Sequence, residues 1–140
     1  MKQRNEKCVM VIDESLPVGV IANTAAIMGM SLGKALPELI GEDVRDAAGS
    51  EHRGIIELPV PVLRGSAQRI RKLRERLGEP EFSGLTAVDF SDLAQGCGTY
   101  EEFIEKMRMA PENELNYLGI ALCGDKKKVN RLTGCLPLLR

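Results

Sequence analysis

The sequence predicts an α/β fold, a single mixed, mostly parallel sheet of four or five strands with helices on both faces. Short apolar runs rich in β-branched residues alternate along the chain with segments of helical composition. The length of 140 residues is that of one domain. We therefore expect residues 1–140 to form one domain.

The first strand is predicted at residues 8–12, a continuous apolar run that ends at Asp13. A continuous run, in contrast to an alternating one, indicates a strand buried on both faces. From about Ile21 an alanine-rich stretch predicts a helix that apolar residues nearly encircle, so we expect it to be largely buried. We interpret Gly29 and Gly33 in this helix as close-packing positions.

Four further segments follow in order. Residues 41–54 are polar and irregular and predict a long loop. Residues 55–63 have the composition of a strand, but their two prolines cannot donate to a ladder, so we expect an edge or a bulge there. An amphipathic helix begins after Ser66 and ends at Gly78. Residues 85–90 predict another strand.

The carboxyl-terminal third predicts two helices around a buried strand. Thr99 and Glu102 fit a capping box at the start of one helix. Residues 115–122 form an apolar run typical of a buried strand. Asp125 caps the last short helix, which ends at Gly134.

Charge and hydropathy restrict the function classes. Nineteen Lys and Arg against 20 Asp and Glu give a net charge of -1, which argues against a whole-surface polyanion binder, and no DNA is expected. No apolar run approaches the roughly 20 residues that span a bilayer. The polar amino terminus does not resemble a signal peptide. We therefore expect a cytoplasmic protein without a membrane partner.

The cysteines and the single histidine predict no metal site and no cofactor. The four cysteines include no C-x-x-C pair, and His52 lies far from them along the chain. Cys8 and Cys123 lie in apolar runs, and we interpret them as reduced core residues. His52 lies in a polar loop, where it is either a general base or an exposed side chain without a role.

Polar residues follow two of the predicted strands. Asp13 leaves the first strand and Asp92 follows the strand at residues 85–90. If these strands are parallel, both carboxylates lie at the rim of the sheet where α/β proteins collect ligands. Asn23 and Thr24 lie near the predicted start of the buried helix, where free N–H groups bind anions. The alternative is that Asn23, Thr24 and Asp92 only cap their helix or turn.

The helix over residues 66–77 carries five basic residues and one acid. A second basic cluster, at residues 126–128, lies near Arg131. Such runs are typical of a solvated helix face. The functional alternative is a local contact with phosphate backbones, for which Arg71 and Arg74 are the RNA-contact candidates.

Several motifs resemble those of the type 2 peptidyl-tRNA hydrolases. Residues 117–121 and 129–136 are similar to the family's L-G-I-G-P strand and its helix ending V-T-G-x-L. Gly84-Leu85-Thr86 and Asp92 match its G-L-T…D spacing, and the opening strand and alanine-rich helix are also similar. More specifically, the V-I-D-E…A-N-T-A-A segment at residues 11–26 resembles an uncharacterised bacterial group of that fold, a domain of unknown function.

The sequence departs from the hydrolase pattern at the positions that carry its chemistry. Ala22 stands where the family has the second lysine of G-K-G-K, and Ala26 and Gly29 stand where it has Gln and His. Asn116 replaces the polar residue before the L-G-I strand, and Asp92 persists. A lysine binds phosphate or an oxyanion, and a histidine transfers protons, so their loss changes the site.

Two functions follow as expectations. The first is a small-polar-ligand or interaction module whose pocket is lined by Asp13, Asn23, Thr24 and Asp92, with Asn116 beside them. The second is a divergent hydrolase that acts on a peptidyl-tRNA-like or nucleotide-linked ester, with Asp92 polarising a water. The resemblance also implies a homodimer.

Overall fold

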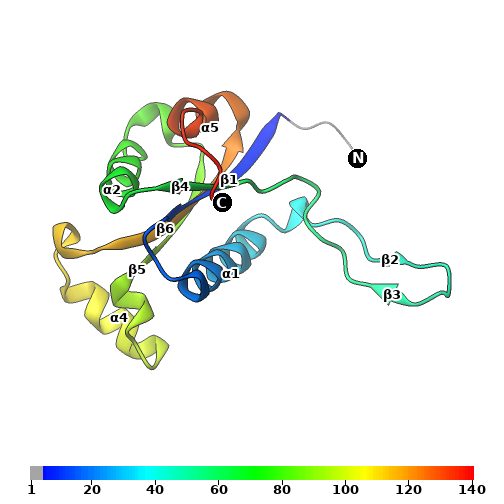
Figure 1. The fold of residues 1–140 in the computed structure, drawn as a ribbon, viewed down its shortest axis with the longest axis horizontal. Coiled ribbons are helices and arrows are strands. Elements are labelled where there is room, and N and C mark those ends of the chain that lie inside the picture. The colour runs from blue at the N-terminus through cyan, green and yellow to red at the C-terminus, as the bar shows by residue number, and fades with distance from the viewer. Residues whose placement is uncertain (1–4) are drawn as a thin grey trace.

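The structure is a computed structural model that describes residues 5–140, and a four-stranded mixed sheet forms its centre (Figure 1). The strand order is β4-β1-β6-β5, and the strands are β1 (Glu6–Asp13), β4 (Val62–Gly65), β5 (Thr86–Ser91) and β6 (Tyr117–Asp125). Only β1 and β4 are parallel, whereas β6 runs antiparallel to both β1 and β5. The prediction of a mostly parallel sheet was therefore wrong, because β6 enters between β1 and β5 in the opposite direction.

Helices cover both faces of this sheet, as predicted. Helix α1 packs on one face, and α2 and α5 pack on the other. The short helix α3 and helix α4 follow β5 at the sheet's rim. The helix bounds are α1 (Val18–Ala35), α2 (Ala67–Arg76), α3 (Asp92–Gln95), α4 (Tyr100–Met109) and α5 (Lys126–Thr133).

The core consists of two apolar clusters, one on each face of the sheet. Along β1, Val9 and Val11 point to α2 and α5, whereas Cys8, Met10 and Ile12 point to α1. All five side chains are buried, which confirms the prediction of a strand covered on both sides. Strand β6 is buried in the same way over residues 117–123.

Side-chain caps begin α2, α4 and α5 where the sequence predicts, whereas α1 begins after Pro17 without one. Ser66 Oγ accepts from Arg69 N at 3.2 Å, and Asp125 Oδ2 accepts from Lys128 N at 3.2 Å. Thr99 Oγ1 accepts from Glu102 N at 3.1 Å. The Glu102 carboxylate in turn accepts from Gly98 N, also at 3.1 Å. These side chains satisfy amide groups that the first helical turn leaves unpaired.

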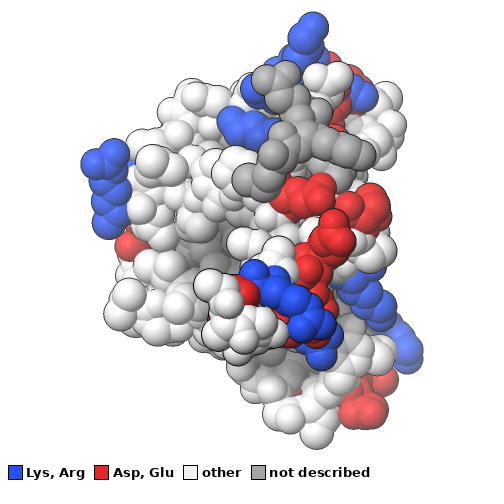
Figure 2. Space-filling model, turned by 90° about the vertical axis from the view of Figure 1, so that its right-hand side faces the viewer, with Lys and Arg blue, Asp and Glu red and all other residues white. Residues whose placement is uncertain are grey.

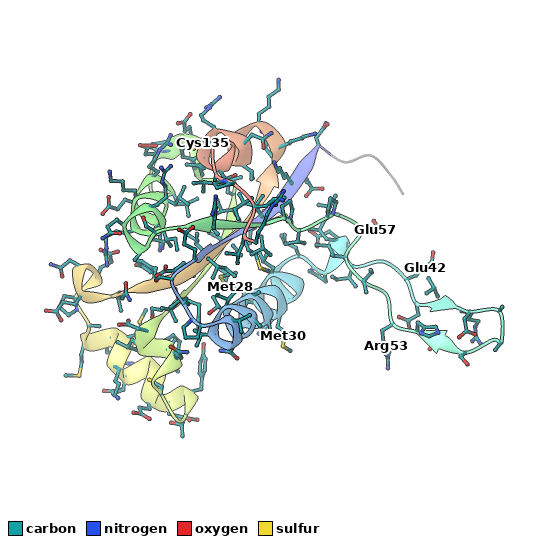
Figure 3. The ribbon with its side chains drawn as sticks, in the orientation of Figure 1. Met28, Met30, Glu42, Arg53, Glu57 and Cys135 are labelled. Carbon is teal, nitrogen blue, oxygen red and sulfur yellow. A yellow bond between two sulfur atoms is a disulfide. The ribbon has the colours of Figure 1, made fainter. Side chains whose placement is uncertain are left out.

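Helix α1 is less buried than predicted. Among its 18 residues only Thr24, Met28 and Leu32 are buried, and Val18 and Met30 are 83% and 81% exposed. Figure 3 shows Met28 directed to the sheet and Met30 directed away from it. By length and composition alone α1 could cross a membrane, a test that core helices of soluble proteins also pass. The helix is half exposed because no second layer covers its outer face within residues 5–140.

Residues 41–54, predicted as a loop, project from the domain as a two-stranded hairpin (Figure 1). Its strands are β2 (Val44–Arg45) and β3 (Glu51–His52). The turn is held by Asp46, whose Oδ1 accepts from Ala48 N and Ser50 N at 2.9 and 3.0 Å. Figure 2 shows the side of the molecule from which the hairpin projects, where basic and acidic side chains are interspersed.

The predicted strand over residues 55–63 is shorter and lies later in the chain. Strand β4 begins at Val62, after Pro59 and Pro61, and occupies the edge of the sheet. Pro59 and Pro61 cannot donate to the ladder because they have no N–H, although the Pro61 carbonyl accepts from Met10 N at 3.0 Å. The carboxyl-terminal segment covers this edge, since Arg64 N donates to Pro137 O at 2.9 Å.

Cys8 and Cys123 lie directly opposite each other on β1 and β6 and form a disulfide. Both residues are buried, as predicted, but their interpretation as reduced thiols is contradicted. Two residues 115 positions apart become neighbours only when the strands pair. The free cysteines are Cys97, which is half-buried, and Cys135, which is exposed.

Candidate functional site

Asp13 and Asp92 leave the sheet at the same rim. Strands β1 and β5 both run antiparallel to β6 and therefore point in the same direction. Because β6 separates them, the two strand axes lie two strand spacings apart, about 10 Å. The shared rim is thus present, although the strands that form it are not neighbours.

The Asp13 side chain stabilises the turn that follows β1 by hydrogen bonds to Ser15. It is 7% exposed, and its Oδ1 accepts from Ser15 N at 3.0 Å and from Ser15 Oγ at 2.7 Å. Strand alternation places it on the same face as Val9 and Val11, which contact the α2 and α5 layer.

Asn23 and Thr24 lie on the other face of the sheet, in the second turn of α1. The helix begins at Val18, earlier than predicted, so these residues are not at its amino terminus. Thr24 is fully buried, and its Oγ1 donates to the Val20 carbonyl at 2.7 Å. A Cβ at Gly119 would lie 2.8 Å from Thr24 Cγ2, so Thr24 packs closely on β6. Asn23 is exposed, and within residues 5–140 the hydrogen bonds of the Asp13 carboxylate go to Ser15 and not to Asn23.

Asp92 and Asn116 are brought together. Asp92 Oδ1 accepts from Asn116 N at 3.2 Å and from Leu93 N at 2.8 Å, and Asp92 N donates to Asn116 O at 2.9 Å. The Asp92 carboxylate therefore holds the start of α3 against the segment before β6. Both residues are exposed.

Arg71 is occupied by contacts within the domain. Its guanidinium donates to the Leu115 carbonyl and to the Glu112 carboxylate at 3.3 Å, and it lies 5.3 Å from the centre of the Tyr117 ring. Arg74 pairs with Asp89 on β5, with Nε 3.2 Å from Oδ2. The two predicted RNA-contact residues thus lie on the side of α2 that contacts β5, β6 and the segment before β6.

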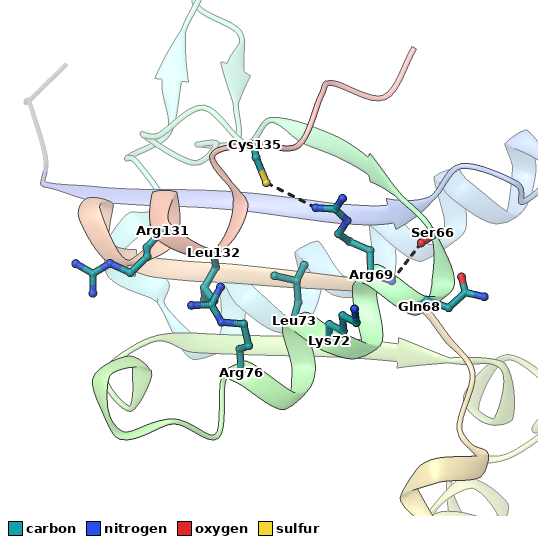
Figure 4. A pocket seen from close by; sticks show the side chains of 9 residues that line it. All are labelled: Ser66, Gln68, Arg69, Lys72, Leu73, Arg76, Arg131, Leu132 and Cys135. Atoms are coloured by element: carbon teal, nitrogen blue, oxygen red, sulfur yellow. Dashed lines mark hydrogen bonds between the residues drawn. The ribbon is translucent and has the colours of Figure 1, made fainter.

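The opposite side of α2 and the end of α5 form a groove of about 470 Å³. Figure 4 shows Arg69 extending from α2 toward Cys135, which follows α5, with Leu73 and Leu132 between the two helices. Four lining side chains are cationic and none is a carboxylate. The lining residues are Ser66, Gln68, Arg69, Lys72, Leu73, Arg76, Arg131, Leu132 and Cys135.

The cations of this groove differ in how far they are neutralised. Arg76 lies 3.8 Å from Glu79, and Arg131 pairs with Glu81. Lys72 forms no ion pair within residues 5–140, and Arg69 Nη1 donates to the Cys135 Sγ at 3.7 Å. Neither Arg69 nor Lys72 therefore has a carboxylate partner in the described part of the chain, so the groove is electropositive.

The amino-terminal end of α2 adds to this potential. Ser66 and Gln68, the residues at that end, line the same groove. Backbone N–H groups and the helix dipole favour negative charge at a helix amino terminus. The groove thus combines side-chain cations with the positive end of a ten-residue helix.

The sequence indicates the basic helix, and the residues expected to contact RNA, Arg71 and Arg74, lie on another face of it than the groove. Residues 69, 72 and 76 follow the i, i+3, i+7 spacing of one helix face, and residues 71 and 74 lie on another. This spacing separates two groups of cations but does not say which group faces solvent. Cys135 and Gln68 carried no sequence signal that pointed to the groove.

His52 lies on the projecting hairpin, where its Nε2 is 2.8 Å from Asp46 Oδ2. This hydrogen bond is the main cause that lowers the pKa of Asp46, followed by the Ser50 backbone N–H. The pair is exposed and stabilises the hairpin turn. Among residues 5–140, no group of three His, Cys, Asp or Glu side chains is arranged to hold a metal ion.

Comparison with known proteins identifies relatives of this chain. A family described as "Protein of unknown function (DUF2000)" matches residues 6–140. A solved structure of a protein of unknown function, Atu0240 from Agrobacterium tumefaciens strain C58, is similar over 97% of this chain and 98% of that chain, with a TM-score of 0.87 and 21% identity. At that identity the likeness shows a shared fold. No curated protein matches this chain.

Proposed function

The chain belongs to the DUF2000 family of proteins of unknown function, and we propose that it binds a small phosphate-bearing molecule in the groove between α2 and α5. The observation that carries this proposal is the set of four cations around a groove without a lining carboxylate. A volume of about 470 Å³ lies in the range of small-molecule sites. The proposal keeps the expected small-polar-ligand module but places the ligand between the helices.

The groove offers each part of such a ligand a matching surface. Lys72 and Arg69 are available as charged hydrogen-bond donors for a phosphate group. Ser66 and Gln68 add uncharged polar groups at the positive end of α2. Leu73 and Leu132 supply an apolar floor for a flat or aliphatic part of the ligand.

Calorimetric titration with AMP, with adenosine as the phosphate-free counterpart, tests the proposal. We expect saturable binding of AMP and much weaker binding of adenosine. Lys72→Gln should weaken AMP binding at least tenfold, because a hydrogen bond to a charged group contributes about 1.5–3 kcal/mol. Arg108→Gln on α4 is the matched control, since Arg108 is exposed and does not line the groove. Equal binding of AMP and adenosine would contradict phosphate recognition.

The RNA-linked alternative uses the same groove for a phosphate backbone. This alternative predicts saturable tRNA binding at moderate salt. The binding should be lost in the double variant Arg69→Glu, Lys72→Glu and retained in the double variant Arg71→Glu, Arg74→Glu. Binding lost only in the second variant would instead support the RNA-contact residues expected from the sequence.

The divergent hydrolase is the second candidate, and the observation that favours it is the state of Asp92. This carboxylate is exposed, and its Oδ2 atom forms no hydrogen bond within residues 5–140, so it is free to polarise a water. In this proposal Asn116 and Asp13 stand at the same rim as Asp92, whereas the α1 residues Asn23 and Thr24 lie on the other face of the sheet. Turnover of peptidyl-tRNA that is abolished by Asp92→Asn would establish this activity.

The homodimer expected from the resemblance is also a proposal. Its support is the exposure of apolar side chains on α1, among them Val18 and Met30, which are largely in solvent. Light scattering of the purified chain distinguishes a monomer from a dimer directly.

A further inference from the structure

A second cavity lies on the α1 face of the sheet, between α1, β1 and the segment before β4. Its volume is about 300 Å³. None of its lining side chains is charged, and the only heteroatoms among them are the sulfurs of Met10 and of the disulfide-bonded Cys8. The lining residues are Cys8, Met10, Gly29, Leu32, Gly33, Leu36, Leu39, Ile40, Ile55, Ile56 and Val60.

Two glycines of α1 form part of the cavity wall. A Cβ at Gly33 would meet no atom within 4 Å, and one at Gly29 would meet only the Met10 methyl group at 3.6 Å. Their interpretation as close-packing positions was therefore wrong. Gly119 on β6, by contrast, is a close-packing position, because a Cβ there would lie 2.8 Å from Thr24 Cγ2.

Glycine is among the least favourable residues in a helix interior. Packing does not require it at position 29 or 33, and any larger side chain at position 33 would extend into open space. The two glycines, one helical turn apart, instead leave the wall of the cavity without side chains. Their effect is to keep a space open beside the apolar floor that Cys8 and Met10 provide.

We propose that this cavity binds a small, uncharged apolar molecule. The walls offer dispersion contacts and no hydrogen-bonding side chain, so a polar or charged ligand would lose its hydration without compensation. A buried apolar cavity of about 150 Å³ binds benzene, and this cavity, whose lining residues Ile40 and Ile55 are exposed to solvent, has about twice that volume. A two-ring aromatic molecule or a medium-length aliphatic chain therefore matches it in size.

This site is independent of the phosphate-binding proposal. The cavity lies on the α1 face, whereas the basic groove lies between α2 and α5 on the other face. A ligand here is recognised by shape and burial, so its affinity should not fall as the salt concentration rises. Failure of one proposal consequently leaves the other open.

Fluorescence titration with N-phenyl-1-naphthylamine tests the inference on the full chain. We expect saturable binding with one site per chain and displacement of the probe by 1-decanol. Displacement by 1-decanol would show that aliphatic chains share the site, whereas binding without displacement would restrict the ligand to aromatic rings. Gly33→Leu should weaken probe binding at least tenfold, because Gly33 lines the cavity and a leucine side chain there takes up part of the space that the probe needs.

Gly19→Leu is the matched control, since Gly19 is also on α1 and a Cβ added there would meet no atom within 4 Å, but it does not line the cavity. It should bind the probe like the unmodified chain. Should Gly33→Leu fail to fold by circular dichroism, Gly33→Ala provides the same test with a smaller expected loss. Absence of saturable binding, or equal affinity in both position-33 variants and the unmodified chain, would overturn the proposal.

Discussion

Arg69 Nη1 lies 3.7 Å from the Sγ atom of Cys135, a contact that joins α2 to the segment after α5. The two residues are 66 positions apart and stand on opposite walls of the basic groove. Cys135 is exposed, so its thiol is a chemical reporter inside the proposed phosphate site.

Alkylation of Cys135 by iodoacetamide should slow when AMP is present. A ligand that occupies the groove shields the thiol and withdraws Arg69 from it. Peptide mapping by mass spectrometry measures the rate at Cys135 and, as an internal control, at Cys97, which lies outside the groove. Equal slowing at both cysteines would indicate a global effect and would count against a ligand in the groove.

Replacement of Arg71 should destabilise the domain more than replacement of Arg74. Arg71 binds the Leu115 carbonyl and the Glu112 carboxylate and stacks on Tyr117, so Arg71→Ala should cost about 1–3 kcal/mol of unfolding free energy. Arg74 makes one partly exposed ion pair with Asp89, worth about 0–1 kcal/mol.

Urea unfolding followed by circular dichroism compares the two arginine variants. We expect the midpoint of Arg71→Ala to fall clearly below that of Arg74→Ala. Indistinguishable midpoints would mean that the Arg71 contacts do not hold the segment before β6.

Tyr117 predicts a loss of stability at alkaline pH. Burial, together with the 2.9 Å hydrogen bond and the negative charge of Glu112, raises the pKa of Tyr117 to about 12. An unfolded tyrosine has a pKa of about 10. Because the folded state favours the protonated phenol, this contribution is complete below about pH 10 and is lost as the pH approaches about 12.

Chemical denaturation across this pH range, with Tyr117→Phe as the control, isolates the contribution of the phenol. The variant lacks the ionising group and should lose less stability over the alkaline range than the unmodified chain. Identical alkaline profiles for the two proteins would contradict the assignment.

The Cys8–Cys123 disulfide predicts two free thiols in the unfolded chain. Under denaturing conditions without reductant, thiol titration should count Cys97 and Cys135 only, and all four cysteines after reduction. A bridge between residues 115 positions apart should add about 4–5 kcal/mol in the chain-entropy account. Four reactive thiols without reductant would show that the pair is reduced.

Locally encoded features of the fold were predictable from the sequence. The apolar run at residues 8–12 and the caps Ser66, Thr99 and Asp125 depend on neighbours within a few positions, and the structure confirms each. Strand direction was not predictable in this way. The path of β6 depends on pairing with β1, whose residues lie more than 100 positions away, as well as on pairing with β5.

The same distinction applies to the candidate site. The basic residues of α2 are visible in the sequence. Which of them contact the rest of the domain, as Arg71 does, and which line the groove, as Arg69 does, depends on where β5 and β6 lie. Thr24 was predicted to bind a ligand because its hydroxyl lies near the expected start of the helix after the first strand. In the folded chain Thr24 donates to its own helix and packs against Gly119.

The most direct test of the phosphate site is a map of amide chemical-shift changes on titration of the isotope-labelled chain with AMP. We expect the changes to concentrate at residues 66–76 and 131–135, around the groove that Arg69 and Lys72 line. Changes concentrated around Asp92 and Asn116 instead, with the groove unaffected, would contradict the phosphate site.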